Sequence, residues 1–185
     1  GGYTSGSYTA ARTMMRHGSV GRSVGRAVRG LPAPASRPAV ALKEMLRVLK
    51  PRGRIAFSTW PPEHFTGRMF SFIASHMPPL PPGVEPPSPP ALWGDPNVVR
   101  QRLGDAVKDL RFSRDALIMP MLSIQHFRMA QEKTIGPLTR VVAALHGDPT
   151  GLARLRAEFE AMAEEVFDDN AIHMPFLMTR ATKTA

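Results

Sequence analysis

The sequence predicts an α/β fold in which helices alternate with the strands of an open sheet and a helical insertion precedes the last strand. The first observation is an amphipathic helical pattern at residues 39–50 that stops at a Pro/Gly turn and leads directly into an apolar strand, Arg54–Trp60. The second is an alternating strand pattern at Leu110–Met121. The third is a run of helical patterns between that strand and an apolar segment at Phe176–Thr182.

Size and composition favour one globular domain without a membrane span. The chain has 185 residues, 43% of them hydrophobic, and no apolar run approaches the ~18 residues of a spanning helix. It contains no cysteine, which excludes disulfides, thiolate metal sites and a cysteine nucleophile. No signal peptide can be read, because no apolar core follows the N-terminal arginines, so we expect a cytoplasmic protein.

Residues 1–38 are expected to form a disordered Arg/Gly/Pro-rich tail. The segment has six arginines, no acid and no sustained apolar periodicity, so it cannot bury enough surface to offset its ordering entropy. These six charges account for most of the net charge of +9 and leave +3 for residues 39–185. The alternatives are an arginine-rich arm that binds nucleic acid or an acidic surface, and a tail read from a shifted frame.

Residues 39–60 form one predicted helix–turn–strand unit. Ser36 can cap the helix, and Pro38 suits its first turn. Four apolar side chains with i, i+3, i+4, i+7 spacing share one face of the helix: Leu42, Met45, Leu46 and Leu49. The strand that follows is almost continuously apolar, which is typical of a strand covered on both faces.

Two helices are predicted on either side of a proline-rich loop. An apolar stripe indicates a helix at Phe65–Met77. Residues 78–90 are dominated by proline and should be extended and stiff, as a lid or surface loop or as a polyproline ligand for a partner. Asp95 can cap a short helix at Pro96–Leu103.

A strand, three helices and a closing strand complete the predicted fold. Leu110–Met121 alternates between apolar and polar side chains. Ser123 and Asp148 are suited to begin helices. Three helical patterns follow the strand, at 123–130, 137–145 and 149–167. In the closing strand, Phe176–Thr182, we expect Pro175 at the first position, where no ladder N–H is needed.

One stretch of the sequence is similar to the signature of a known family. Glu44–Arg54 reads E-M-L-R-V-L-K-P-R-G-R and leads into Ile55–Trp60. Leu92–Gly94, Asp109–Phe112 and Ala181–Lys183 add further similarity. Over residues 37–184 the chain resembles the C-terminal part of the class I S-adenosylmethionine-dependent methyltransferases, which commonly read E-x-x-R-V-L-K-P-G-G before their fifth strand. Arg52 stands here in place of the first glycine of that pair.

This resemblance implies a Rossmann-like sheet with helices on both faces, of which the chain holds the strands equivalent to the fifth, sixth and seventh. The last strand would be inserted antiparallel beside the fifth. The family holds S-adenosylmethionine with a glycine-rich turn after the first strand and an acid after the second. Gly18, Gly21 and Gly25 follow no strand pattern, and no acid precedes Glu44. Since each βαβ unit takes roughly 30 residues, we expect residues 39–185 to be a partial methyltransferase-like α/β domain without the cofactor-binding half.

Three side chains are candidates for a substrate pocket. Ligands of open α/β sheets lie beyond the carboxyl ends of the strands. Trp60 and His64 follow such an end, and Trp93 follows the proline-rich loop that could fold over it. His64 could accept a proton there. The alternative is that both tryptophans pack the insertion and that His64 is an exposed loop residue.

The remaining histidines and acids indicate no metal site, because no H-E-x-x-H spacing occurs. No catalytic or cofactor-binding residue can be assigned from the sequence. The acids between Glu158 and Asp169 are typical of a solvated helix face.

We expect a protein of the methyltransferase family that transfers a methyl group from S-adenosylmethionine to a small-molecule acceptor. A chain without the cofactor-binding half should be inactive. The acceptor class follows from the helical insertion, which resembles a substrate cap, and from a nearly neutral body that disfavours nucleic acid. The alternative is a non-catalytic interaction module that pairs through an exposed sheet edge, as a homodimer or with another chain.

Overall fold

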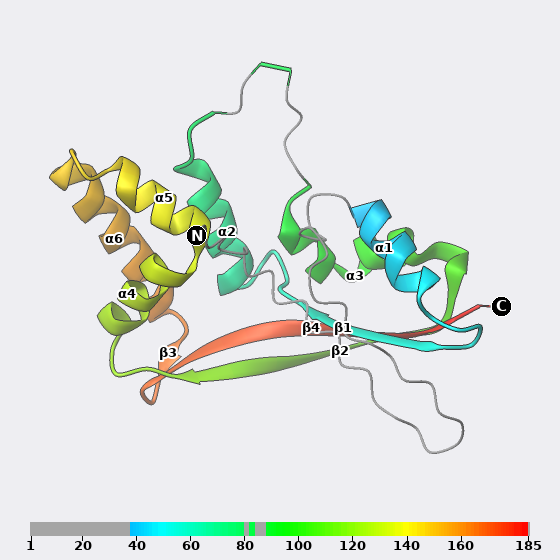
Figure 1. The fold of residues 1–185 in the computed structure, drawn as a ribbon. Coiled ribbons are helices and arrows are strands. Elements are labelled where there is room, and N and C mark those ends of the chain that lie inside the picture. The colour runs from blue at the N-terminus through cyan, green and yellow to red at the C-terminus, as the bar shows by residue number, and fades with distance from the viewer. Residues whose placement is uncertain (1–37, 80–81, 84–87, 185) are drawn as a thin grey trace, which may run out of the picture. The chain divides into compact units, whose positions relative to one another are not determined.

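A computed structural model describes residues 38–79, 82–83 and 88–184 (Figure 1). The expected tail disorder, the cap at Ser36 and the centre of the proline-rich loop lie outside the described residues. The described residues form two units. The sheet unit contains 38–62, 88–115 and 176–184, and the helical unit contains 63–79, 82–83 and 116–175.

The elements follow the predicted order. They are α1 (Pro38–Arg47), β1 (Arg54–Thr59), α2 (Phe65–Ser75), η1 (Pro90–Gly94), α3 (Pro96–Leu103), η2 (Gly104–Ala106), β2 (Val107–Pro120), α4 (Ile124–Thr134), α5 (Gly136–Ala144), α6 (Pro149–Glu164), β3 (Phe167–Asp168) and β4 (Ala171–Lys183). The mixed α/β class and the helical insertion between β2 and β4 are confirmed. The sequence did not predict the two short 3₁₀ helices, η1 and η2, or the two-residue strand β3.

The sheet is open and its long strands have the order β1-β4-β2. β1 pairs antiparallel with β4, in a register that runs from Arg54↔Thr182 to Thr59↔Leu177. The closing strand therefore lies antiparallel beside the strand of the helix–turn–strand unit, as expected. Among the described residues, β1 and β2 are the edge strands.

The core of the sheet unit lies on one face of its strands. α1 and α3 lie on the same side of β1 and β4 (Figure 1), and α1 packs against α3. Eight buried side chains form this core: Leu42, Ile55, Phe57, Trp93, Val99, Leu103, Val107 and Ala181. The apolar faces of the helices and the strand thus meet as their spacing predicts.

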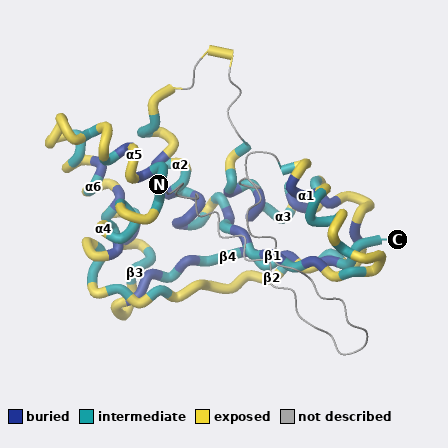
Figure 2. Tube along the Cα trace, in the orientation of Figure 1, coloured by how far each residue is buried: buried dark blue, intermediate teal, exposed yellow. Residues whose placement is uncertain are grey.

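The prediction that β1 is covered on both faces is wrong. Its side chains alternate, with Ile55, Phe57 and Thr59 buried and Arg54 exposed. The physical reason is that the described helices of this unit cover one side of the strand only, so that small residues such as Ala56 suffice on the other. Figure 2 shows β2 as mostly exposed along its length.

Helix starts were predicted correctly where a side chain caps the first turn. Asp95 accepts a hydrogen bond from the Asn97 N–H at 2.8 Å, at the start of α3. The Ser123 hydroxyl accepts from the His126 N–H at 3.0 Å, at the start of α4. Asp148 accepts from the Gly151 N–H at 2.9 Å, at the start of α6. These bonds satisfy N–H groups that have no partner within the helix.

The helical unit is built on an aromatic cluster. α2 packs against α5 and α6, and α4 also packs against α5 and α6. The rings of Phe65, Phe127 and Phe159 meet with centroids 5.9–6.5 Å apart, and Phe72 lies 6.5 Å from Phe159. Phe65, Phe127 and Phe159 are each 1% exposed, so this cluster is the centre of the unit.

β4 begins earlier than predicted, and Pro175 lies inside it instead of at its first position. Asp169 and Asn170 both have positive φ, 46° and 53°, which is the backbone of a tight two-residue hairpin turn. That turn starts β4 at Ala171. The β1–β4 register ends at Leu177, so β1 requires no N–H from Pro175.

Candidate functional site

The carboxyl end of β1 is tied to η1 by a buried hydroxyl. The Thr59 Oγ1 donates to the Trp93 carbonyl oxygen at 2.7 Å and lies 3.5 Å from the Leu177 carbonyl oxygen. Thr59 is 8% exposed. One side chain of β1 therefore links the η1 backbone with the neighbouring strand β4.

Gly94 allows the two backbones to approach closely. A β-carbon at this position would collide with the Trp60 carbonyl group and with Cα of Pro61. Trp60 and Trp93, predicted together as pocket residues, are thus brought together through their backbones at the end of β1. The predicted site is a place where two chain segments are in van der Waals contact.

Trp93 packs in the core of the sheet unit. It is 5% exposed. Its ring stands edge-on to Phe57, with centroids 5.8 Å apart and an interplanar angle of 89°. The guanidinium carbon of Arg102, on α3, lies 4.7 Å from the indole centroid. A cation over an indole face is stabilised by the ring quadrupole.

Trp60 and His64 lie in different surroundings from Trp93. Trp60 is the residue that follows β1, and it is half-buried. His64 belongs to the helical unit and is the N-terminal residue before α2, although its side chain does not cap the helix. Its Nε2 lies 3.9 Å from a Glu63 carboxylate oxygen, and its side chain is 36% exposed. The role of His64 as a proton acceptor stays a prediction.

Several buried polar atoms of the sheet unit have no hydrogen-bond partner among the described residues: Trp93 Nε1, Arg102 Nη1 and Thr179 Oγ1. Thr179 is opposite Phe57 in the β1–β4 register. Burial lowers the pKa of the Arg102 guanidinium, whose Nη2 donates to Ser88 Oγ at 3.1 Å. The sequence did not single out Arg102. Arg100 and Arg102 lie on the same short helix, and their spacing does not distinguish one from the other.

The resemblance makes β1 the equivalent of the family's fifth strand, whereas S-adenosylmethionine is held in that family by the turns after the first and second strands. β1 is followed here by Trp60, Pro61 and Pro62. The described residues therefore include none that the resemblance assigns to the methyl donor.

In residues 38–79, 82–83 and 88–184, no three His, Asp or Glu side chains gather in a way that could hold a metal ion. No helix in this part of the chain is both long and apolar enough to cross a membrane.

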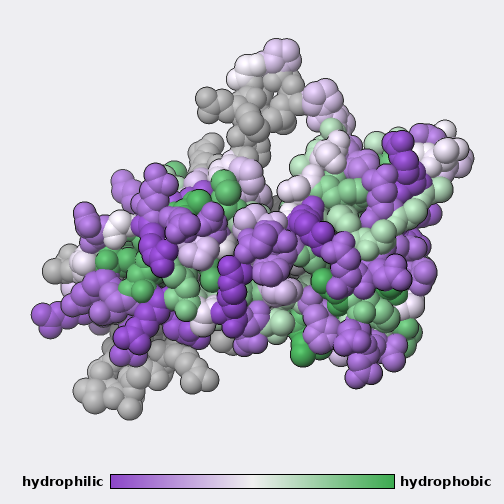
Figure 3. All heavy atoms as spheres, turned by 180° about the vertical axis from the view of Figure 1, so that it is seen from behind, coloured by the Kyte–Doolittle hydropathy of each residue, from purple (hydrophilic) through white to green (hydrophobic). Residues whose placement is uncertain are grey.

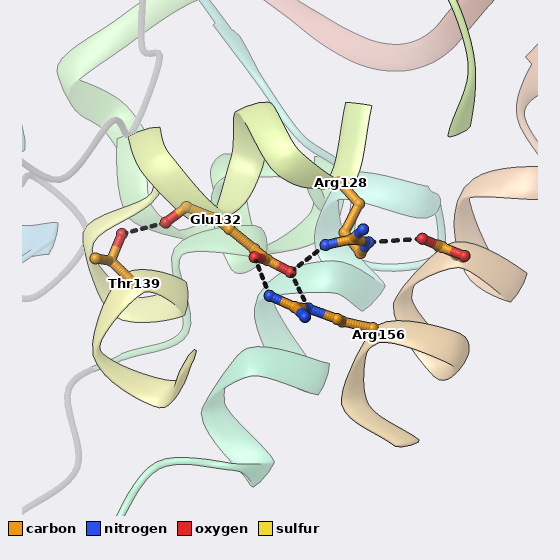
Figure 4. A network of polar contacts seen from close by, with 5 residues as sticks. Arg128, Glu132, Thr139 and Arg156 are labelled. Atoms are coloured by element: carbon orange, nitrogen blue, oxygen red, sulfur yellow. Dashed lines mark hydrogen bonds and ion pairs between the residues drawn. The ribbon is translucent and has the colours of Figure 1, made fainter. Parts of the chain in front are cut away.

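The densest charged cluster lies in the helical unit (Figure 4). Glu132 accepts from Arg128 Nη1 at 2.6 Å and from Arg156 at 2.9 and 3.0 Å, and Arg128 Nε donates to Glu160 at 2.6 Å. The Arg128 and Glu132 side chains are 14% and 13% exposed. These bonds join α4 to α6 through paired charges.

The recess beside this cluster is too narrow to hold a water molecule; Leu138, Leu155 and Phe159 line it together with the charged groups. In the described part of the chain, the exposed large apolar side chains are Val40, Val48, Leu117, Ile118, Leu122 and Met129. Hydrophilic side chains are interspersed with hydrophobic ones on the face drawn in Figure 3. This face therefore shows no dominant apolar surface.

Comparison with known proteins gives relatives that lack an assigned function. No family model matches the chain. An uncharacterized protein of Mycobacterium tuberculosis is 29% identical over 149 residues, which cover 77% of this chain and 52% of that protein. An uncharacterized protein of Mycobacterium bovis matches equally well. A second M. tuberculosis protein, also uncharacterized, is 27% identical over 141 residues, 76% of this chain and 50% of that protein. The chain spans about half the length of the curated relatives it matches.

The contact at Gly94 predicts a large cost for one added methyl group. Gly94→Ala should lower the free energy of unfolding by about 1–3 kcal/mol, because backbone must move to relieve the clash with Trp60. Gly147→Ala is the matched control, since no atom lies within 4 Å of a β-carbon there, and it should stay within about 1 kcal/mol of wild type. Urea unfolding measures both. Equal effects would show that η1 is not packed on the end of β1.

The ion-pair cluster predicts a pH-dependent stability. Burial alone would raise the pKa of Glu132, but the hydrogen bonds and charges of Arg156 and Arg128 outweigh it and lower the pKa. In the unfolded chain a glutamate has a pKa of about 4.3. The stabilisation by ionised Glu132 is therefore complete above that pH and is lost as the pH falls through the lower folded pKa.

Glu132→Gln should accordingly cost about 2 kcal/mol at pH 7, and the difference from wild type should shrink below about pH 4.3. Glu158→Gln, which removes a partner of Arg154 at 3.8 Å on an exposed surface, should change stability by less than about 0.5 kcal/mol. Urea unfolding at several pH values checks this. A difference that grows on acidification would contradict the assignment.

Proposed function

We propose that the chain is the acceptor-side part of a class I S-adenosylmethionine-dependent methyltransferase whose substrate is a small molecule. The observation that carries the proposal is the α1–turn–β1 unit with its Arg47–Pro51 sequence, followed by a β4 that is inserted antiparallel beside β1. In this family the fifth and seventh strands have that relationship. Sequence signature and strand pairing therefore support the same assignment.

The lengths of the relatives also support the proposal. The aligned part covers 52% of the M. tuberculosis protein, so about as much chain again lies outside the alignment. That length accommodates the four strands and crossover helices that would precede β1, at roughly 30 residues for each βαβ unit. On this proposal the donor-binding turn and its acid belong to that other half.

In the proposed enzyme, the described residues position the acceptor and do not bind the donor. Methyl transfer from a sulfonium requires mainly alignment of donor and acceptor and exclusion of water. The end of β1 suits that task because Thr59 and Gly94 hold the chain around Trp60 in a fixed place. His64 and the α4–α6 insertion belong to the helical unit, and their roles as proton acceptor and as substrate cap stay predictions.

The second candidate function is a non-catalytic interaction module. The specific observation that favours it is that β1, among the described residues, pairs on one edge only. An unpaired strand edge is a template for another strand, from a second copy or a different chain.

Calorimetric titration with S-adenosylmethionine tests the methyltransferase proposal. The full-length M. tuberculosis relative should bind S-adenosylmethionine saturably, because it would hold both halves of the sheet. The present chain, checked for folding by circular dichroism, should give no heat of binding at millimolar ligand. A full-length relative that gives no heat would contradict the proposal. Binding by the present chain would contradict the division of donor and acceptor sides.

A further inference from the structure

The Trp93–Arg102 stack holds two buried hydrogen-bond donors without acceptors. Trp93 Nε1 and Arg102 Nη1 are both shielded from solvent, and neither has a partner among the described residues. They belong to one stack, since the guanidinium carbon lies 4.7 Å from the indole centroid. Trp93 itself is 5% exposed.

Buried donors of this kind are costly when they stay unpaired. A buried donor without an acceptor loses the hydrogen bond that it made to water in the unfolded chain, and the loss is larger for a charged donor. Most buried polar groups in folded proteins therefore have a protein, water or ligand partner. The described part of the chain supplies Arg102 with one acceptor, Ser88 Oγ, and no carboxylate.

We propose that this stack is a binding site for a small anion, a carboxylate or phosphate group whose oxygens accept hydrogen bonds from Arg102 Nη1 and Trp93 Nε1. Both groups donate and cannot accept, so the ligand must supply acceptors. A guanidinium fork matches the oxygen pairs of carboxylates and phosphates. The site stands independently of methyl transfer, because it rests on the unpaired donors alone.

The position of the stack gives such an anion a structural effect. Trp93 is held to β1 by Thr59 and packs on Phe57, while Arg102 is on α3. An anion that bridges the two donors would join η1 to α3 within the core of the sheet unit. Binding should therefore stabilise the folded protein in proportion to ligand occupancy.

The test is NMR of the indole N–H signals during anion titration. The chain has two tryptophans, so Trp60→Phe assigns the Trp93 signal. At constant ionic strength, sodium phosphate or sodium acetate should shift the Trp93 signal saturably, and sodium chloride should not. Phosphate acting alone identifies a phosphate site, and acetate acting alone identifies a carboxylate site.

Three arginine variants test the site and control for general charge effects. Arg102→Met should weaken the anion response at least tenfold, and Arg102→Lys, which keeps the charge but loses the fork, should weaken it partly. Arg100→Met is matched, because Arg100 is on the same helix and lies 4.9 Å from the Phe112 ring centroid, yet its Nη1 already donates to Asn97. It should leave the response unchanged. If Arg102→Met does not fold, the test rests on Arg102→Lys, whose response to the anion should be weaker than that of wild type.

Two results would overturn the proposal. One is a Trp93 signal that responds to no anion. The other is an equal loss of response in Arg100→Met, which would indicate general charge attraction.

Discussion

The antiparallel pairing of β1 with β4 is the constraint on which the sheet unit depends. It joins residues 54–59 to residues 177–182, more than a hundred positions later, in continuous register. Because side chains alternate along a strand, this register places Ile55, Phe57 and Ala181 on the face that α1 and α3 cover. Thr59 extends the constraint to η1 through its bond to Trp93. Slipping the register by one residue would turn the apolar set away from the helices.

The same pairing explains why the candidate site lies where it does. With β4 on one edge of β1 and helices on one face, the carboxyl end of β1 is the point at which Trp60, Gly94 and the Trp93–Arg102 stack are held together. The helical unit has its own centre, the phenylalanine cluster with the Arg128–Glu132–Arg156 network beside it. Its charges are paired with one another, so the network contributes to the stability of that unit.

Local signals in the sequence predicted local structure well. Asp95, Ser123 and Asp148 begin helices because each cap is decided within three residues. The class of fold followed from the alternation of helical and strand periods. One failure depended on distant partners: an apolar run cannot show whether one or both faces of β1 are covered. The Asp169–Asn170 turn, which moves the start of β4 ahead of Pro175, was missed because proline suggested a strand end. The Trp93–Arg102 stack has no sequence signal, since only the packing of α3 on η1 creates it.

Residue-resolved hydrogen exchange of the β1 amides tests the central claim most directly. If β1 pairs with β4 on one edge and is open on the other, protection along Arg54–Thr59 should alternate. N–H groups that point to β4 should exchange only on unfolding, and the intervening ones should exchange rapidly. Uniform protection along β1 would show that a further strand, from this chain or a second copy, covers the outer edge. Absence of protection throughout β1 would show that the β1–β4 pairing is not formed.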